Sequence, residues 1–208
     1  MVEKKKHNNL EYLISFPDSY DANKKYPVLF YIHGAGGRGR DLSLLEDSLI
    51  LSTMKKNNDN RFITVLPQCF ADTWFEIFEQ LQEFVGYIIS QSFSDKSRIY
   101  LTGTSMGAYT SWQLAMTMND VFAAIIPVCG GGMYWNAERL KDIPIWAFHG
   151  ALDSTVYPEE SLKMVAAVNN CGGNANITIL PRTGHNAWDD AFTDPQIYDW
   201  LLQHSKQL

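Results

Sequence analysis

Short apolar runs rich in β-branched and aromatic residues recur along this chain, and segments of helical pattern separate them. The middle runs are apolar throughout, as strands covered on both faces of a sheet must be. Alternation of strand and helix with right-handed crossovers gives a mostly parallel sheet between two layers of helices. The predicted strands are Glu11–Phe16, Pro27–Ile32, Arg61–Leu66, Arg98–Leu101, Phe122–Val128, Pro144–Phe148 and Asn176–Leu180.

The helical segments complete this pattern. Phe75–Ser90 carries apolar residues at helical spacing, which is a stripe suited to packing on a sheet. Ala108–Met118, Glu159–Asn169 and Gln196–Gln203 are predicted to be helical as well. The 208 residues contain no linker, repeat or low-complexity tract. We therefore expect residues 1–208 to form a single three-layer α/β domain.

A Gly-x-Ser-x-Gly stretch, Gly103-Thr-Ser-Met-Gly107, follows the strand predicted at Arg98–Leu101 and precedes a predicted helix. A sharp strand-to-helix turn of this kind lifts a serine Oγ above the sheet and places a helix amino terminus behind it. The alternative is a tight turn with a spectator serine. The context favours Ser105 as a nucleophile.

A serine hydroxyl needs a base to become nucleophilic at neutral pH. His7 and His204 lie near the chain ends, whereas His33 and His149 each close a predicted strand before a glycine, where a histidine more often supports a loop. His185 lies in a glycine-containing loop after the last predicted strand. We therefore expect His185 to be the general base.

The acid that orients this base should lie on a loop after another strand. Asp153 follows the Pro144–Phe148 strand by a few residues, at the carboxyl edge of the sheet. Asp142 precedes that strand and would lie at the wrong edge, and Asp189 and Asp190, just after the histidine, are expected to begin or precede a helix. The order serine, aspartate, histidine is the one expected for an α/β-hydrolase.

An oxyanion hole requires two backbone N–H groups aimed at the developing negative oxygen. We expect one from Met106, the residue after the nucleophile, and the other from Ala35, which has glycines on both sides. The same loop also matches a dinucleotide fingerprint at Gly34-x-Gly36-x-x-Gly39. However, the next strand ends in Val65-Leu-Pro-Gln68 without the expected carboxylate, which disfavours nucleotide binding.

Over nearly its full length the chain resembles the α/β-hydrolase superfamily. Within it, the chain is similar to the small esterases and predicted peptidases that include polyhydroxybutyrate-depolymerase-like proteins and feruloyl and acetylxylan esterases. The resemblance implies an α/β-hydrolase fold without a large cap domain. The matching motifs are His33-Gly-Ala-Gly-Gly, Pro67-Gln-Cys, Gly103-Thr-Ser-Met-Gly, His149-Gly-Ala-Leu-Asp153, Gly184-His-Asn-Ala-Trp188 and the segment that begins at Asp194.

These features predict a serine esterase that works through an acyl-enzyme, with no metal or organic cofactor. Its substrate is expected to be a small-molecule or carbohydrate-linked ester with a short acyl or arylacyl group. Trp74, Trp135 and Trp188 lie in loops at the predicted catalytic edge, so we expect them to line an open cleft that contacts substrate. A peptidase and a non-catalytic binding protein of the same fold remain alternatives.

Charge and cysteine content limit the partners. The net charge is −6, and no basic run extends beyond Lys4-Lys5-Lys6, which disfavours nucleic acid. No apolar run reaches membrane-spanning length, so no membrane partner is expected. An odd count of three cysteines and the absence of a signal-peptide pattern favour a cytoplasmic location, or a secreted one if a leader has been removed. The oligomeric state is not indicated.

Overall fold

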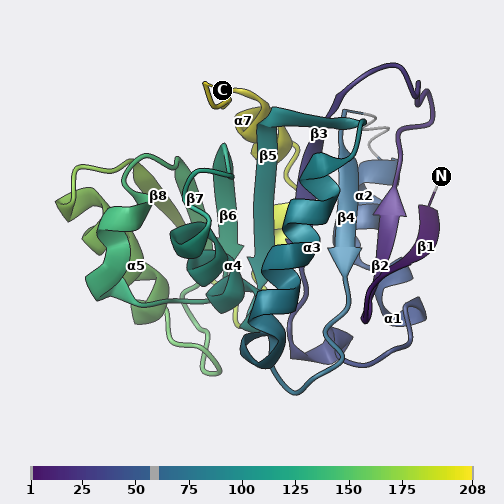
Figure 1. The fold of residues 1–208 in the computed structure, drawn as a ribbon. Helices are drawn as coiled ribbons and strands as arrows, with labels where there is room; N and C mark the ends of the chain where they lie inside the picture. Colours follow the sequence, from purple (N-terminus) through teal and green to yellow (C-terminus); the bar gives the residue numbers. More distant parts are fainter. Residues whose placement is uncertain (1, 57–60, 208) are drawn as a thin grey trace.

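The computed structural model describes residues 2–56 and 61–207 (Figure 1). Within these ranges a single eight-stranded sheet forms the centre of the molecule. Each of the seven strands expected from the sequence is present, most with ends displaced by one or two residues. The strands are β1 Val2–His7, β2 Leu10–Ser15, β3 Tyr26–Ile32, β4 Ile63–Pro67, β5 Ser94–Thr104, β6 Ala124–Val128, β7 Ile145–Gly150 and β8 Ala175–Leu180.

The strands are ordered β1-β2-β4-β3-β5-β6-β7-β8 across the sheet. β2 runs antiparallel to both of its neighbours, β1 and β4, whereas the pairs from β4 to β8 are all parallel. The mostly parallel sheet predicted from the sequence is therefore confirmed. Because the parallel strands run in one direction, their carboxyl ends share one edge, which lies at the bottom of Figure 1.

Helices cover both faces of the sheet. On one face lie α3 (Phe78–Ser90), α4 (Met106–Thr117) and α5 (Glu159–Asn170), which pack on a core that includes Phe30 and Leu101. On the other face lie α1 (Ser43–Glu46), α2 (Leu49–Lys56), α6 (Trp188–Thr193) and α7 (Gln196–Leu202), packed on a core that includes Leu29 and Tyr100. Successive residues of a strand thus enter opposite cores, as the alternation of side chains along a strand requires.

The helix predicted at Phe75–Ser90 begins three residues later than expected. A 3₁₀ turn, Trp74–Ile77, precedes α3. Its start is fixed by Thr73 and Glu76, because the Glu76 carboxylate accepts a hydrogen bond from the backbone N–H of Thr73 at 2.8 Å, in a capping box. The apolar stripe located the helix correctly, but the local hydrogen bonds of this turn determined where its regular part begins.

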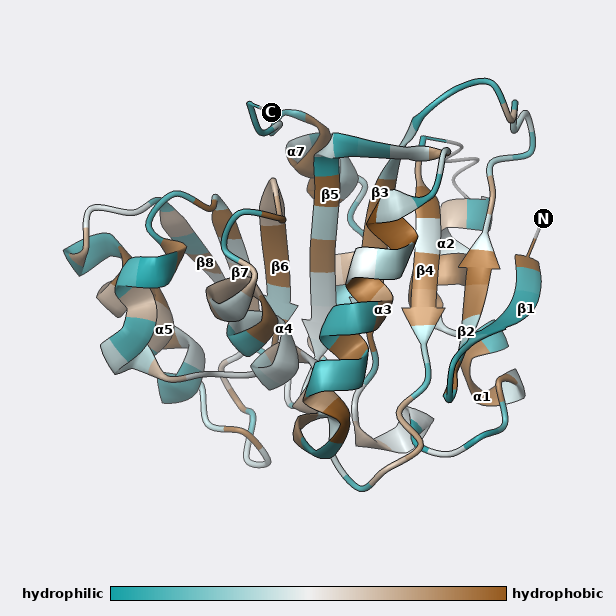
Figure 2. Ribbon diagram, in the orientation of Figure 1, coloured by the Kyte–Doolittle hydropathy of each residue, from teal (hydrophilic) through white to brown (hydrophobic). Residues whose placement is uncertain are grey.

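The edge strand β1 was not predicted. Its sequence, VEKKKH, lacks an apolar alternation, and the exposed Lys4, Lys5 and Lys6 give it a hydrophilic surface (Figure 2). Backbone pairing with β2 holds it in the sheet, and a charged surface is common on edge strands because it discourages pairing with other chains. Among the described residues, no helix is both long and apolar enough to cross a membrane.

Candidate active site

A tight backbone turn joins β5 to α4. Ser105 occupies it with φ 53° and ψ −119°, a conformation that a residue with a side chain adopts only under strain. Its backbone N–H donates to the carbonyl oxygen of Val128 at 2.9 Å, which ties the turn to the end of β6. The turn leaves the Ser105 side chain partly exposed at the carboxyl edge of the sheet.

The two glycines of this turn permit a close approach of α4 to the sheet. A Cβ atom on Gly107 would collide with the carbonyl group of Ile32 at the end of β3. A Cβ atom on Gly103 would collide with the carbonyl of Gly107 and with the Ser111 side chain. The glycine spacing recognised in the sequence thus has a steric cause, because α4 could not start directly above the sheet with larger residues here.

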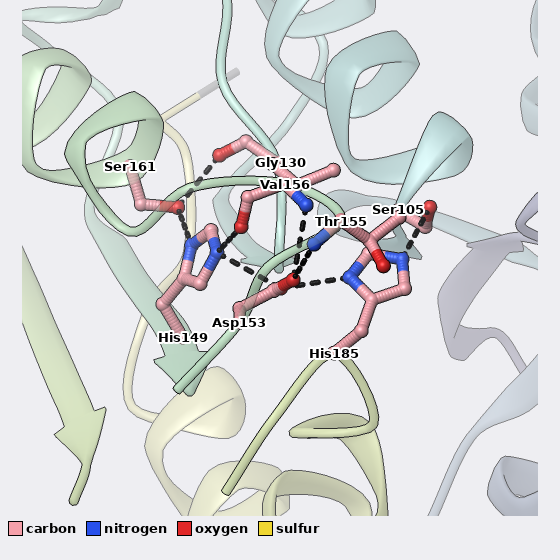
Figure 3. Close-up of polar contacts among 8 residues, drawn as sticks. All are labelled: Ser105, Gly130, His149, Asp153, Thr155, Val156, Ser161 and His185. Atoms are coloured by element: carbon pink, nitrogen blue, oxygen red, sulfur yellow. Dashed lines mark hydrogen bonds and ion pairs between the residues drawn. The ribbon is translucent and has the colours of Figure 1, made fainter. Parts of the chain in front are cut away.

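Three side chains from three different strand ends meet at this edge (Figure 3). Ser105 follows β5, Asp153 follows β7 and His185 follows β8. The Oγ atom of Ser105 lies 2.9 Å from Nε2 of His185, and Nδ1 of His185 lies 2.7 Å from Oδ2 of Asp153. The structure therefore brings together, in a hydrogen-bonded line, the three residues that the sequence analysis selected.

Asp153 is held from several directions. Its Oδ1 accepts hydrogen bonds from the backbone N–H groups of Thr155 and Val156, both at 2.9 Å, and its side chain is completely buried. Burial alone would raise the pKa of this carboxyl, but the hydrogen bonds from His185, Val156 and Thr155 outweigh it and hold the pKa below the usual value. Asp153 is therefore an anion at neutral pH.

The competing acids lie elsewhere. Asp189 and Asp190 occupy the first turn of α6, as the sequence suggested, and both are exposed. Asp189 accepts a hydrogen bond from the Asn186 side chain at 2.8 Å, and Asp190 accepts one from Thr183 at 2.9 Å. Each of these carboxylates therefore supports a local turn, whereas the acid bonded to the His185 ring is Asp153.

The two predicted oxyanion donors both open a helical turn. Ala35 begins the 3₁₀ turn Ala35–Gly37, and Met106 begins α4. In the described part of the chain, neither backbone N–H has a hydrogen-bond acceptor, as is usual for the first residues of a helix. The Ala35 loop lies against the nucleophile, because a Cβ atom built on Gly34 would come within 3.3 Å of Cβ of Ser105.

His33 supports this loop, as predicted for a histidine at a strand end. Its Nε2 accepts a hydrogen bond from the backbone N–H of Cys69 at 2.9 Å, and its Nδ1 lies 2.6 Å from the carbonyl oxygen of Gly34. Burial lowers the pKa of His33 to about 4. The ring is therefore neutral, with its proton on Nδ1, and fastens the donor loop to the segment that follows β4.

The three tryptophans expected to contact substrate have different environments. Trp188 is half-buried, and its ring lies edge-on to that of His185 with centroids 5.2 Å apart. Trp135 is 72% exposed beside Tyr134. Trp74 has no exposed surface, so the prediction that it contacts substrate is wrong. Its loop does reach the catalytic edge, but its side chain turns inward beneath the Ala35 loop and completes the core.

A pocket of about 490 Å³ opens beside Ser105 and His185. Its apolar wall was not foreseen and comes partly from the short helices α1 and α2. No Asp, Glu, Lys or Arg is among the described residues that line it. The wall consists of Leu44, Leu45, Leu49, Trp188 and Phe192.

Cys129 is a further neighbour of this site. It follows β6 directly with φ 55°, is completely buried as expected, and its Sγ lies within 4.8 Å of possible ligand atoms of Asp153 and His185. Burial, with a smaller contribution from Asp153, raises the pKa of the Cys129 thiol to about 12. The thiol is therefore protonated, and Asp153 and His185 already bond to each other, so we assign no metal ion to this group.

The fold and this site define an α/β-hydrolase. The model of the phospholipase/carboxylesterase family matches residues 65–201, more than half of the chain, and the protein belongs to that family. It is 25% identical to "Probable feruloyl esterase C" of Aspergillus niger over 87% of this chain and 69% of that protein.

Solved structures agree with this assignment. The crystal structure of a thermostable esterase is 27% identical, covers 99% of this chain and superimposes with a TM-score of 0.87. A ferulic acid esterase with 16% identity shares the fold over 98% of this chain and 97% of its own, with a TM-score of 0.75. The protein spans 63% of the thermostable esterase and 69% of the Aspergillus protein, so about a third of each has no counterpart here.

Proposed function

We propose that the protein hydrolyses carboxylic esters through an acyl-enzyme, with Ser105 as nucleophile, His185 as general base and Asp153 as the residue that orients His185. The observation that carries the proposal is the line of two hydrogen bonds, 2.9 Å from Ser105 to His185 and 2.7 Å from His185 to Asp153. Nucleophile, base and orienting acid in this arrangement are the parts that acyl transfer needs.

In the proposed reaction, Oγ of Ser105 attacks the ester carbonyl while Nε2 of His185 takes its proton. The negative oxygen of the tetrahedral intermediate accepts hydrogen bonds from the backbone N–H groups of Ala35 and Met106. His185 then gives its proton to the leaving alcohol. Water repeats the sequence on the acyl-enzyme, which releases the acid and restores Ser105. The reaction requires no metal or organic cofactor, so EDTA should leave the rate unchanged.

We propose a short acyl or arylacyl ester as the substrate. The pocket beside Ser105 is apolar and contains no charged side chain among its described lining residues, which suits a neutral, flat group. The edge-on ring of Trp188 beside His185 offers an aromatic contact at the reacting end. The name of the Aspergillus relative, a feruloyl esterase, fits this class. A contact between Trp135 and the more distant part of a substrate stays a prediction, as does the cytoplasmic location.

The first test is covalent labelling with a fluorophosphonate probe, using Ser105→Ala as the control. We expect labelling of the native protein and none of the variant. A native protein that does not react would be a binding protein with a hydrolase fold. The second test compares p-nitrophenyl acetate, butyrate and decanoate with methyl ferulate and with peptide anilides. Faster cleavage of the anilides would make the protein a peptidase, and preference for decanoate would contradict the proposed substrate class.

A further inference from the structure

Asp153 has a second histidine neighbour. His149 lies in β7, is completely buried, and its Nε2 is 3.2 Å from Oδ2 of Asp153, the oxygen that His185 also contacts (Figure 3). In the proposed mechanism His149 touches neither the substrate nor Ser105. Nevertheless, a buried ring beside the anion that orients the base affects how that anion is placed.

The hydrogen-bonding surroundings of Nε2 determine whether it carries a proton. Besides Asp153, its neighbour is the carbonyl oxygen of Val156 at 2.9 Å. A carbonyl oxygen and a carboxylate can accept a hydrogen bond but cannot donate one. Nε2 of His149 must therefore be an N–H, which donates to the Val156 carbonyl oxygen and lies 3.2 Å from the Asp153 carboxylate.

The protonation of the other ring nitrogen, Nδ1, follows from its contact with Ser161 and from the contact of Ser161 with Gly130. Nδ1 of His149 lies 2.7 Å from Oγ of Ser161, and this Oγ lies 2.6 Å from the carbonyl oxygen of Gly130. Ser161 has one hydroxyl proton, and the Gly130 oxygen can only accept it. The shorter contact, 2.6 Å, directs that proton to Gly130, which leaves Nδ1 of His149 as the donor to Ser161.

We infer that His149 is an imidazolium cation that pairs with Asp153 and positions it for His185. The inference rests on the proposed function for its catalytic meaning. His33 is a useful comparison for the protonation of His149, because it is also buried and also precedes a glycine near the end of a strand. His33, however, accepts from Cys69 through one nitrogen and faces a carbonyl through the other, so it needs a single proton.

A buried cation is stable only beside a compensating charge. Asp153 supplies that charge. The backbone N–H groups of Thr155 and Val156 donate to its other oxygen, Oδ1, and hold the carboxylate in place. Ionisable groups near this pair on the surrounding elements include Cys129 after β6, Glu160 on α5, Tyr109 on α4 and His185 after β8. The contact with His149 restrains the Asp153 carboxylate to the orientation that holds the His185 ring toward Ser105.

The direct test is the ¹⁵N NMR spectrum of the histidine rings at pH 7, because it reports protons without using activity. Peaks are assigned with His149→Gln and His33→Gln. We expect both ring nitrogens of His149 to be protonated and those of His33 to show a single Nδ1 proton. A neutral His149 ring would overturn the inference and leave the proposed esterase activity untouched.

The activity test compares His149→Gln with Ser154→Ala, a control at an exposed position in the loop that carries Asp153. We expect His149→Gln to lower kcat about tenfold or more with little change in KM, because the base is oriented less well. A kcat within about twofold of the native value and an unchanged KM would refute a positioning role.

Ser161→Ala gives a second route if His149→Gln fails to fold. This substitution removes the acceptor of Nδ1, so His149 should lose one ring proton in the NMR spectrum and kcat should fall without a matching rise in KM. An unchanged ring and an unchanged kcat in this variant would equally overturn the inference.

Discussion

The indole N–H of Trp74 donates a hydrogen bond to the carbonyl oxygen of His33 at 3.0 Å, and the two rings lie 4.9 Å apart. This bond joins the turn before α3 to the loop that carries Ala35. A side chain expected to bind substrate is in fact a buried support of the loop that we propose as an oxyanion donor.

Replacing Trp74 by Phe should therefore destabilise the protein without changing its substrate preference. The variant leaves the His33 carbonyl without this donor, which should cost about 1–3 kcal/mol in the free energy of unfolding. Urea unfolding measures that loss. The kcat/KM values for p-nitrophenyl acetate and methyl ferulate should fall by the same factor. A selective rise in KM for the ferulate would mean that Trp74 contacts substrate after all.

Ser105→Ala should lower kcat by roughly 10⁴-fold or more, and His185→Ala by a similar factor, because the members of a triad act as a unit. The double variant should then be little worse than either single variant. Initial rates on p-nitrophenyl acetate provide the comparison. Losses that multiply in the double variant would show that the two residues act independently.

Asp153→Asn should lower kcat by about 10⁴-fold, because an amide in this position favours the wrong tautomer of His185. Asp189→Asn is the matched control, since Asp189 is exposed on the neighbouring helix and bonds to Asn186. It should retain nearly native activity. A larger loss in the control than in Asp153→Asn would assign the acid role to Asp189.

The lowered pKa of Asp153 also makes a prediction for stability. A carboxyl group whose pKa is lower in the folded than in the unfolded state stabilises the fold above its unfolded pKa of about 3.9. That contribution disappears as the pH falls through the folded pKa. The native protein should thus lose more unfolding free energy between about pH 5 and pH 3 than Asp153→Asn does. Equal losses in urea titrations would contradict the lowered pKa.

The three cysteines should differ in reactivity. Cys171 is exposed, whereas Cys69 and Cys129 are buried and burial raises the pKa of both thiols, that of Cys129 to about 12. Because the thiolate is the reactive form, iodoacetamide at about pH 8 should modify Cys171 alone in the native protein and all three after denaturation. Mass spectrometry distinguishes these outcomes. Modification of Cys129 in the folded protein would mean that its strand end opens readily.

The sequence predicted the parts of the fold that follow from regular spacing. Continuous apolar strands and the stripe of α3 follow from periodicity, and the Ser105 turn follows from the spacing of its glycines. The location of Asp153 and His185 followed from a topological rule, because loops after parallel strands meet at one edge.

Features that depend on contacts between distant segments could not be read from the sequence. Strand β1 has no apolar pattern and exists through its pairing with β2. The direction of the Trp74 side chain depends on an acceptor 41 residues earlier. The ring contacts of His149 depend on Ser161 of α5 and, through it, on the Gly130 carbonyl, which lie 12 and 19 residues away in the chain.

The position of β8 at the edge of the sheet links the proposed activity to the assembly of the fold. In the described sheet β8 pairs with β7 alone, and His185 follows it, whereas Ser105 follows β5, in the middle of the sheet. Hydrolysis would therefore require β8 to be paired with β7 as well as β5 to be formed in the centre of the sheet. During refolding, regain of hydrolysis would consequently report docking of this edge strand rather than formation of the centre alone.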